Sequence, residues 1–203
     1  MRRLMTLLLL CCLAPLARAQ ADNALLQGVL AELGRHAAVR ADFTQTRSNP
    51  ALTRPQVSQG RLLFVLGHGM LWQTVSPYRE TIALTGSRSA RIDADGSAHP
   101  MRGERGVSQV SQMLQAMLGG KLDEALRQFN VAASGAPARW TLRFVPRQER
   151  VARVLGNIEL QGDDYLQGIT IVMQDGARTE IRFAHTRDAG PLTALEKRAL
   201  ALP

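Results

Sequence analysis

Cysteine is scarce in this chain of 203 residues, and both copies, Cys11 and Cys12, fall within the first nineteen residues. That segment has the three parts of a secretory signal peptide: a basic start, an apolar run, and a small-x-small cleavage site over residues 17–19. We therefore predict a cleaved signal peptide over residues 1–19 and a single domain over residues 20–203. The mature chain would have no thiol, which excludes disulfides, cysteine nucleophiles and cysteine-ligated metals.

The leader favours neither a lipid anchor nor a membrane-spanning helix. A bacterial lipoprotein signal has a small residue just before its cysteine, whereas here Leu10 precedes Cys11 and Cys11 precedes Cys12. The apolar run, residues 4–16, is short of the roughly 20 residues that span a bilayer. No later run is long enough either, so we predict no transmembrane segment in the mature chain.

Lysine is also scarce, with only Lys121 and Lys197, so the basic excess is almost entirely arginine. Removal of the three leader arginines lowers the formal net charge from +8 to +5. Nucleic acid is not an expected partner of an exported protein. An arginine-rich surface of this kind suits anionic head groups or an acidic partner.

The hydrophobic pattern alternates between helical and strand periods. Apolar residues recur at helical spacing in residues 22–38, whereas residues 39–45 alternate between apolar and polar. The short connections between strands imply antiparallel neighbours, and one apolar face per strand implies a sheet covered on one side. The predicted fold class is therefore α+β, a curved antiparallel sheet with helices covering the concave face. Further strands are predicted over 61–66, 70–75, 79–85, 89–93, 140–144, 158–160, 169–173 and 179–183, with helices over 107–118 and 122–129 and a short helix over 192–202.

No catalytic motif stands out. The four histidines, His36, His68, His99 and His185, have no metal-ligand spacing, and each is interpreted as a surface or turn residue. Residues 86–90 lack the second glycine of a nucleophile elbow and lie between two strands. We predict that the protein is not an enzyme and has no cofactor.

Residues 93–104 are the nearest approach to a metal site. Asp93, Asp95, Ser97, His99 and Glu104 occupy ligand positions of a calcium-binding loop, but the loop glycine is displaced to position 96 and a strand precedes it. A hairpin turn at residues 95–96 explains the same pattern without an ion. No metal site is therefore predicted.

The middle of the chain has a soft apolar surface. Met113 and Met117 lie one helical turn apart, with Leu114 and Leu118 beside them. Flexible methionines adapt to a variable guest, but they also fill ordinary cores. Periodicity alone leaves both interpretations open.

Several segments together resemble the LolA family of periplasmic lipoprotein carriers. Residues 39–45 (VRADFTQ) are similar to the family's first strand, and residues 58–62 (SQGRL) to the opening of the next one. Residues 69–73 (GMLWQ), followed by Pro77, match its pattern of an apolar residue, a Trp and a proline turn. The similarity extends over roughly residues 22–185. One departure is the turn over residues 66–69 (LGHG), where family carriers have an Arg-Pro pair whose arginine latches the lid.

The resemblance implies an incomplete β-barrel in the periplasm whose apolar hollow receives the acyl chains of lipoproteins or another long-chain lipid. An inner-membrane transporter would be the donor and an outer-membrane receptor the acceptor, and we expect a monomer. An acyl chain costs about 0.8 kcal/mol per exposed methylene, so a triacylated protein needs a carrier in water. The residues expected to line the hollow are Phe43, Phe64, Trp72, Ile82, Leu84, Met113, Met117, Leu118, Trp140, Leu142 and Phe144.

Two other functions stay open at this stage. The same fold could serve as a periplasmic sensor or interaction module that recognises a partner protein without transporting lipid. A hydrolase is the third possibility, and it would need a base among the four histidines.

Overall fold

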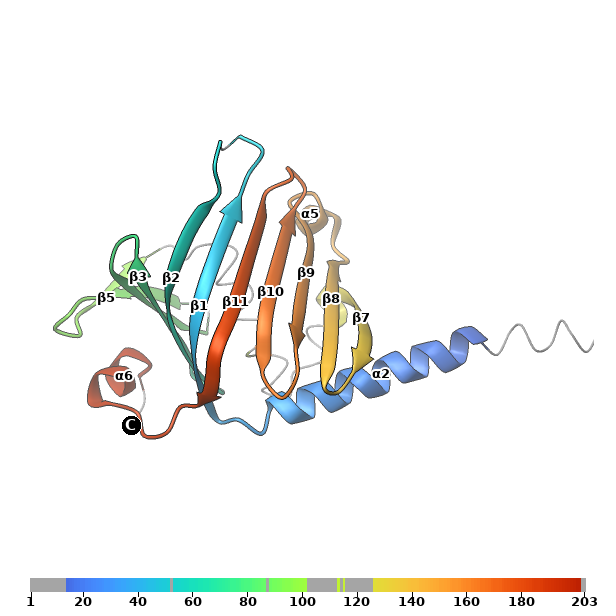
Figure 1. Ribbon diagram of the computed structural model, residues 1–203, viewed down its shortest axis with the longest axis horizontal. Coiled ribbons are helices and arrows are strands. Elements are labelled where there is room, and N and C mark those ends of the chain that lie inside the picture. Colours follow the sequence, from blue (N-terminus) through green and yellow to red (C-terminus); the bar gives the residue numbers. More distant parts are fainter. Residues whose placement is uncertain are drawn as a thin grey trace, which may run out of the picture.

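The fold is an open, strongly curved sheet of eleven antiparallel strands with helices beside it (Figure 1). The computed structural model describes residues 14–51, 53–86, 88–101, 113, 115 and 126–201, with the backbone alone for residues 14–22. The strands are β1 (Ala38–Ser48), β2 (Gln56–Val65), β3 (Gly69–Ser76), β4 (Glu80–Thr85), β5 (Arg88–Ile92), β6 (Ala98–Met101), β7 (Phe129–Ala136), β8 (Arg139–Pro146), β9 (Leu155–Gly162), β10 (Leu166–Met173) and β11 (Arg178–Asp188). The described helices are α2 (Ala14–Leu33), α5 (Glu149–Ala152) and α6 (Ala194–Ala199).

The strand order joins the two halves of the chain through its first and last strands. The order is β6-β5-β4-β3-β2-β1-β11-β10-β9-β8-β7, and every neighbouring pair is antiparallel. Strand β1 pairs with β11, which brings Phe43 opposite Phe183. The sheet is therefore an incomplete barrel, because β6 and β7 are its two edges and do not pair with each other. The predicted fold class is confirmed.

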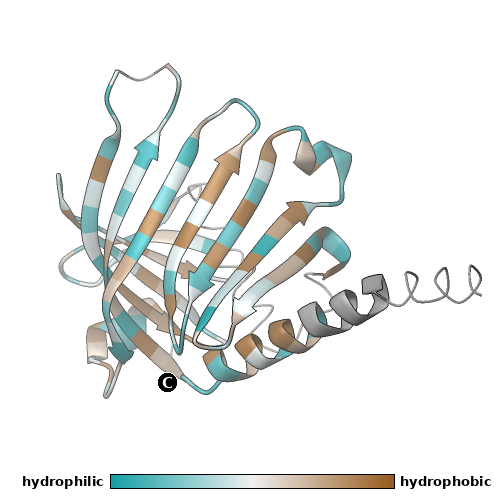
Figure 2. Cartoon of the chain, turned by 45° about the vertical axis from the view of Figure 1, so that its right-hand side comes forward, coloured by the Kyte–Doolittle hydropathy of each residue, from teal (hydrophilic) through white to brown (hydrophobic). Residues whose placement is uncertain are grey.

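Period-two patterning explains most of the strands. Trp140, Leu142 and Phe144 alternate with partly or fully exposed residues along β8, and all three lie on the concave face. Figure 2 shows this alternation as brown and teal bands along the strands. Most of the buried apolar side chains of the strands converge in this way on the concave side of the sheet.

Two predicted helices have wrong boundaries. The first helix spans Ala14–Leu33, not residues 22–38, and Gly34 follows it before β1 begins at Ala38. The second helix was predicted over residues 122–129. Within the described part of that segment, residues 126–128 are helical, but Phe129 is the first residue of strand β7. Strand β7 is rich in Ala, Ser and Gly, so its sequence lacks the bulky alternation by which strands are recognised.

The helices occupy different faces of the sheet. Helix α2 runs along one end of the sheet below β7–β10 (Figure 1), and its Leu26, Val29 and Leu30 join the concave core. Helix α6 instead packs on the convex face, where Leu200 joins Leu63 and other residues of β2–β5 in a second small core. The expectation that each strand has one wet face is therefore wrong for β2–β5. Residues 62–65 are apolar without interruption, so β2 presents apolar side chains on both faces.

None of the described helices is long and apolar enough to cross a membrane. The predicted helix over 107–118 lies outside the described residues except for Met113 and Gln115, both of which are helical.

Candidate functional site

The concave face carries one continuous apolar core that includes most of the predicted lining. Met117 and Leu118 lie outside the described residues. The other nine predicted residues all belong to this core: Phe43, Phe64, Trp72, Ile82, Leu84, Met113, Trp140, Leu142 and Phe144. They come from β1, β2, β3, β4, β8 and the segment around residue 113, so strands far apart in sequence meet on one face.

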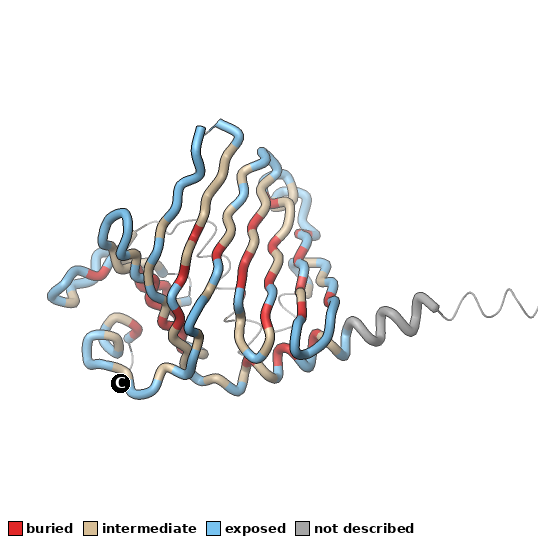
Figure 3. The backbone as a smooth tube through the Cα atoms, in the orientation of Figure 1, coloured by how far each residue is buried: buried red, intermediate tan, exposed pale blue. Residues whose placement is uncertain are grey.

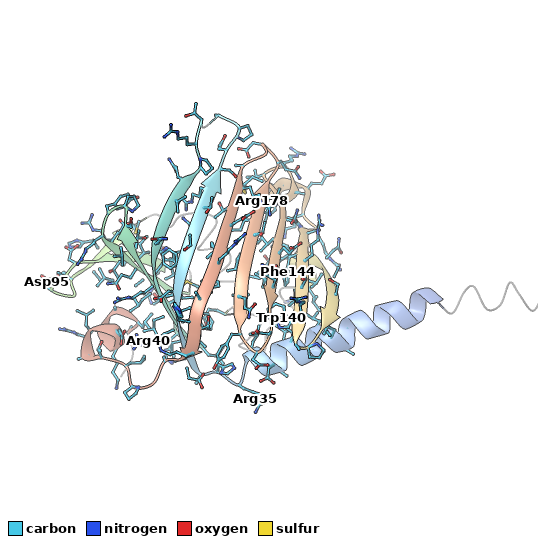
Figure 4. The ribbon with its side chains drawn as sticks, viewed as in Figure 1. Arg35, Arg40, Asp95, Trp140, Phe144 and Arg178 are labelled. Atoms are coloured by element: carbon cyan, nitrogen blue, oxygen red, sulfur yellow. The ribbon has the colours of Figure 1, made fainter. Side chains whose placement is uncertain are left out.

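The β7–β9 part of this core is filled by the protein's own side chains. Leu142 and Phe144 are 0% exposed and Trp140 is 1% exposed. The indole Nε1 of Trp140 donates a hydrogen bond to the backbone carbonyl of Asp163 at 2.6 Å, which satisfies its polar atom. Figure 3 shows the buried residues clustering on these strands, and Figure 4 shows where Trp140 and Phe144 lie on β8. This end has the packing of a structural core.

The β1–β3 and β10–β11 part of the concave face is different, because it borders a cavity of about 70 Å³. Two predicted residues, Phe64 and Trp72, line this cavity. Sequence reasoning missed the rest. Strand alternation could have found those on β1–β3, which have the same parity as Phe43, Phe64 and Trp72, but Leu33, His36 and Tyr165 lie outside the strands. The missed residues are Leu33, His36, Val39, Ala41, Leu62, Met70, Tyr165, Leu166, Ile169, Ile181, Phe183 and Thr186.

Two aromatic rings form one wall beside this cavity. The rings of Phe43 and Trp72 stack with centroids 3.8 Å apart and planes inclined by 24°. Phe43 lies over Gly60, its partner on β2, and a Cβ at position 60 would lie 2.8 Å from the Phe43 ring. The glycine therefore gives the aromatic ring its place on the concave face.

Polar side chains approach this apolar face at two points. The imidazole of His36 lines the cavity, and its Nδ1 lies 2.7 Å from the Asp188 carboxylate. Gln45 is 7% exposed on the concave side of β1, and its amide oxygen has no hydrogen-bond partner. His36 was predicted to be a surface or turn residue. It lies in the connection between α2 and β1, which agrees with a turn, but its side chain is only 16% exposed.

The turn between β2 and β3 is contacted by the side chain of Gln115. The Gln115 amide oxygen accepts a hydrogen bond from the backbone N–H of Gly67 at 2.9 Å, and its Nε2 donates one to the carbonyl of Val65 at 3.1 Å. This is the turn in which the expected latch arginine is missing. Gln115 therefore contacts this turn through both atoms of its side-chain amide.

The convex face has a larger and more polar groove of about 1070 Å³ between β2–β5 and α6. Its deepest ion pair joins Arg40 to Glu196 in a bidentate arrangement, with N–O distances of 2.5 and 2.9 Å. Hydrogen bonds from Arg40 and Thr193 hold the pKa of Glu196 at about 2, against the opposing effect of partial burial. Arginines and carboxylates alternate around the groove: Arg40, Arg61, Arg79, Arg91, Arg187, Asp42, Glu80, Asp93 and Glu196.

The candidate calcium loop forms the hairpin between β5 and β6. The carboxylate of Asp95 accepts a hydrogen bond from the backbone N–H of Ser97 at 2.8 Å, and His99 pairs with Asp93 at 2.9 Å. The hairpin interpretation is confirmed, while Glu104 lies outside the described residues. Within the part of the chain that the structure describes, no three acidic, histidine or cysteine side chains gather as a metal site would require.

An open antiparallel sheet curved around an apolar core and a small cavity defines the class of incomplete-barrel folds. Within that class, this chain belongs to the family described as outer membrane lipoprotein carrier protein LolA-like, whose model matches residues 17–197. The resemblance drawn from the sequence is therefore confirmed. A search of the curated proteins found none that matches this sequence.

Solved structures with the same architecture are distant in sequence. A LolA superfamily protein from Nitrosomonas europaea is 9% identical over 82% of this chain and 94% of its own, with a TM-score of 0.47. MucB in the MucA/MucB complex of Pseudomonas aeruginosa is 10% identical over 83% of this chain and 58% of its own, with a TM-score of 0.48. The lipoprotein LppX of Mycobacterium tuberculosis is 11% identical over 85% of this chain and 98% of its own, with a TM-score of 0.40.

Proposed function

We propose that this protein is a periplasmic, non-enzymatic carrier that shields the acyl chains of lipoproteins, or of a related long-chain lipid, between the inner and outer membranes. The observation that carries the proposal is the apolar cavity on the concave face, bordered by Phe64, Trp72 and Phe183. Membership of a family described as lipoprotein carriers supports it. The signal peptide, an inner-membrane donor and an outer-membrane acceptor belong to the same proposal.

The volume of the cavity determines how cargo would enter. About 70 Å³ is well below the roughly 300–1,000 Å³ of a ligand pocket, so a whole acyl chain needs additional space. We propose that helix α2, whose apolar side chains join the concave core, moves outward to provide it. Of the predicted lining, Phe43, Phe64, Trp72, Ile82, Leu84 and Met113 would then contact cargo, together with Met117 and Leu118. Trp140, Leu142 and Phe144 would contact it least, because they are already fully packed.

Filling the cavity tests the carrier without disrupting the fold. Ala41 is buried and lines the cavity, so Ala41→Leu places added apolar atoms in that space. Ala184→Leu is the matched control, because Ala184 is exposed on β11, one residue beyond the cavity-lining Phe183. We expect Ala41→Leu to keep its melting temperature and to bind a fluorescent fatty acid at least about tenfold more weakly, while Ala184→Leu binds normally.

Native mass spectrometry of protein purified from the periplasm gives an independent test. Lipid adducts on the wild type that are depleted on Ala41→Leu would support the carrier. No adducts, together with no binding of the fluorescent fatty acid by the wild type, would refute it.

A second function is favoured by the charged groove on the convex face. Arg61 and Arg79 line it and have no ion-pair partner among the described residues, so an acidic segment of a partner protein could bind there. On this alternative the protein is an interaction module. Arg61→Glu would then abolish capture of one defined periplasmic protein, whereas Arg143→Glu, on the distant strand β8, would not. Equal capture by both variants would reject this alternative.

A further inference from the structure

His36 lies at the solvent-facing border of the apolar cavity. Its Nδ1 is 2.7 Å from Oδ1 of Asp188, and its ring stacks on Tyr165 with centroids 4.3 Å apart and planes inclined by 28°. The His36 side chain is 16% exposed, whereas the Asp188 carboxylate is 69% exposed. One nitrogen of the ring therefore contacts a solvated carboxylate, while the imidazole itself is part of the cavity wall.

The other ring nitrogen has no partner. Nε2 of His36 is buried and makes no hydrogen bond with the protein. Buried polar atoms nearly always have a partner, because losing water without a replacement hydrogen bond is unfavourable. The rest of the cavity lining is mostly aliphatic and aromatic, including Leu33, Leu166 and Ile169. The nitrogen is thus an isolated polar atom in apolar surroundings.

The pairing with Asp188 assigns the chemistry of this atom. An ionised carboxylate only accepts hydrogen bonds, so Nδ1 of His36 carries the proton that is donated to Asp188. In the neutral ring, Nε2 is then an acceptor. Stacking on Tyr165 and the bond to Asp188 together hold the ring in one orientation.

We infer that His36 is a hydrogen-bond acceptor site at the border of the cavity, and that it binds the hydroxyl or amide N–H at the polar end of a long apolar ligand. The inference rests on the proposed carrier function and specifies it further. The aliphatic part of the ligand would lie against residues such as Phe64 and Ile181, while its polar end would reach His36. The protein would therefore select long-chain compounds that carry a hydrogen-bond donor at one end.

The test compares pairs of ligands in which a methyl group replaces the one donor hydrogen. Dodecanol and its methyl ether form one pair, and N-methyl- and N,N-dimethyldodecanamide form the other, so the two pairs separate hydroxyl from amide donors. Each compound is titrated against a fluorescent fatty acid already bound to the full-length mature protein. We expect the donor of at least one pair to displace the probe at about tenfold lower concentration, the size of one buried hydrogen bond.

Three variants assign the preference to this site. His36→Phe keeps a ring to stack on Tyr165 but has no acceptor. The two compounds of each pair should therefore displace the probe at nearly equal concentrations. Asp188→Ala leaves the ring but releases its orientation, so it should weaken the preference, and the exposed carboxylate makes it a mild change. His99→Phe is the control, because His99 also pairs with an aspartate but lies on β6, and it should keep the wild-type preference.

The outcomes separate this inference from the proposed function. If the wild type binds the probe but displays no donor preference, or prefers the ether, the His36 site is refuted and the carrier stands. A preference that survives both His36→Phe and Asp188→Ala also refutes the site, since the hydrogen bond would then be made elsewhere. Failure of the wild type to bind the probe at all would refute the carrier itself.

Discussion

Gln115 is hydrogen-bonded to Gly67 through its side-chain oxygen, at 2.9 Å from the backbone nitrogen of that turn. A second bond from the same amide reaches the carbonyl of Val65. The two bonds connect the segment around Met113 to the turn between β2 and β3, at the border of the concave face. No arginine occupies that turn, and the Gln115 amide contacts it instead.

Loss of the Gln115 amide should therefore speed the release of cargo. Two hydrogen bonds of about 1 kcal/mol each correspond to a release rate increased by about thirtyfold in Gln115→Ala. Stopped-flow displacement of a bound fluorescent fatty acid measures that rate. Gln73→Ala is the control, because Gln73 is exposed on the convex side of β3. Equal release rates in Gln115→Ala and the wild type would show that these two hydrogen bonds do not retain the cargo.

Gly60 should tolerate no side chain. A Cβ at this position would lie 1.9 Å from the backbone oxygen of Gln73 and 2.8 Å from the Phe43 ring. We expect Gly60→Ala to lower the free energy of unfolding by about 3 kcal/mol, because the colliding oxygen belongs to the backbone of β3. Urea unfolding measures the change. In contrast, Gly28→Ala should raise stability by about 0.5–1 kcal/mol, since that helical position has no neighbour within 4 Å.

The filled end of the concave core should behave as structure and not as a binding surface. Leu142 is 0% exposed, so Leu142→Ala should cost about 2–5 kcal/mol of unfolding free energy. Val145→Ala on the same strand should cost much less, because Val145 is 38% exposed. Chemical denaturation followed by tryptophan fluorescence compares the two. A loss of acyl binding in Leu142→Ala without a loss of stability would show that cargo contacts the β7–β9 part of the core instead.

The ion pair between Arg40 and Glu196 should make the docking of α6 sensitive to acid. The folded-state pKa of Glu196 is about 2, below its ordinary value of 4.5. A carboxyl group whose pKa is lowered by folding stabilises the protein above its unfolded-state pKa, and this contribution is lost as the pH falls through the folded-state value. The loss should therefore occur between about pH 4.5 and pH 2.

Urea unfolding at a series of pH values tests this expectation. Glu196→Gln should flatten the pH dependence of stability in that window. Glu149→Gln is the control, because the Glu149 side chain is 91% exposed in its pair with Arg153. An unchanged pH dependence in Glu196→Gln would show that the pair contributes nothing to the stability of the fold.

Strand patterning predicted the concave face well but not the strand count. The alternation through Trp140 and Phe144 is visible in the sequence because bulky apolar residues recur every second position. Strand β7 was missed because Ala133 is its only fully buried residue and its neighbours are small. The position of α6 could not be predicted from the alternation either. Leu200 packs on the convex face, which the alternating pattern of strands such as β8 predicts to be exposed to solvent.

The sequence by itself determined the fold class, the apolar side of strands such as β8 and the family, because these depend on local periodicity and on the order of short motifs. Only the tertiary structure decided which apolar residues are packed and which border free space. Phe144 and Phe64 have the same strand parity, but one is fully buried in the β7–β9 core and the other lines a cavity. The cavity lies where α2 meets strands β1–β3, β10 and β11, and Phe64 is in that region whereas Phe144 is not. The same arrangement places His36 between Asp188 and that cavity, although the two residues are 152 positions apart in the chain.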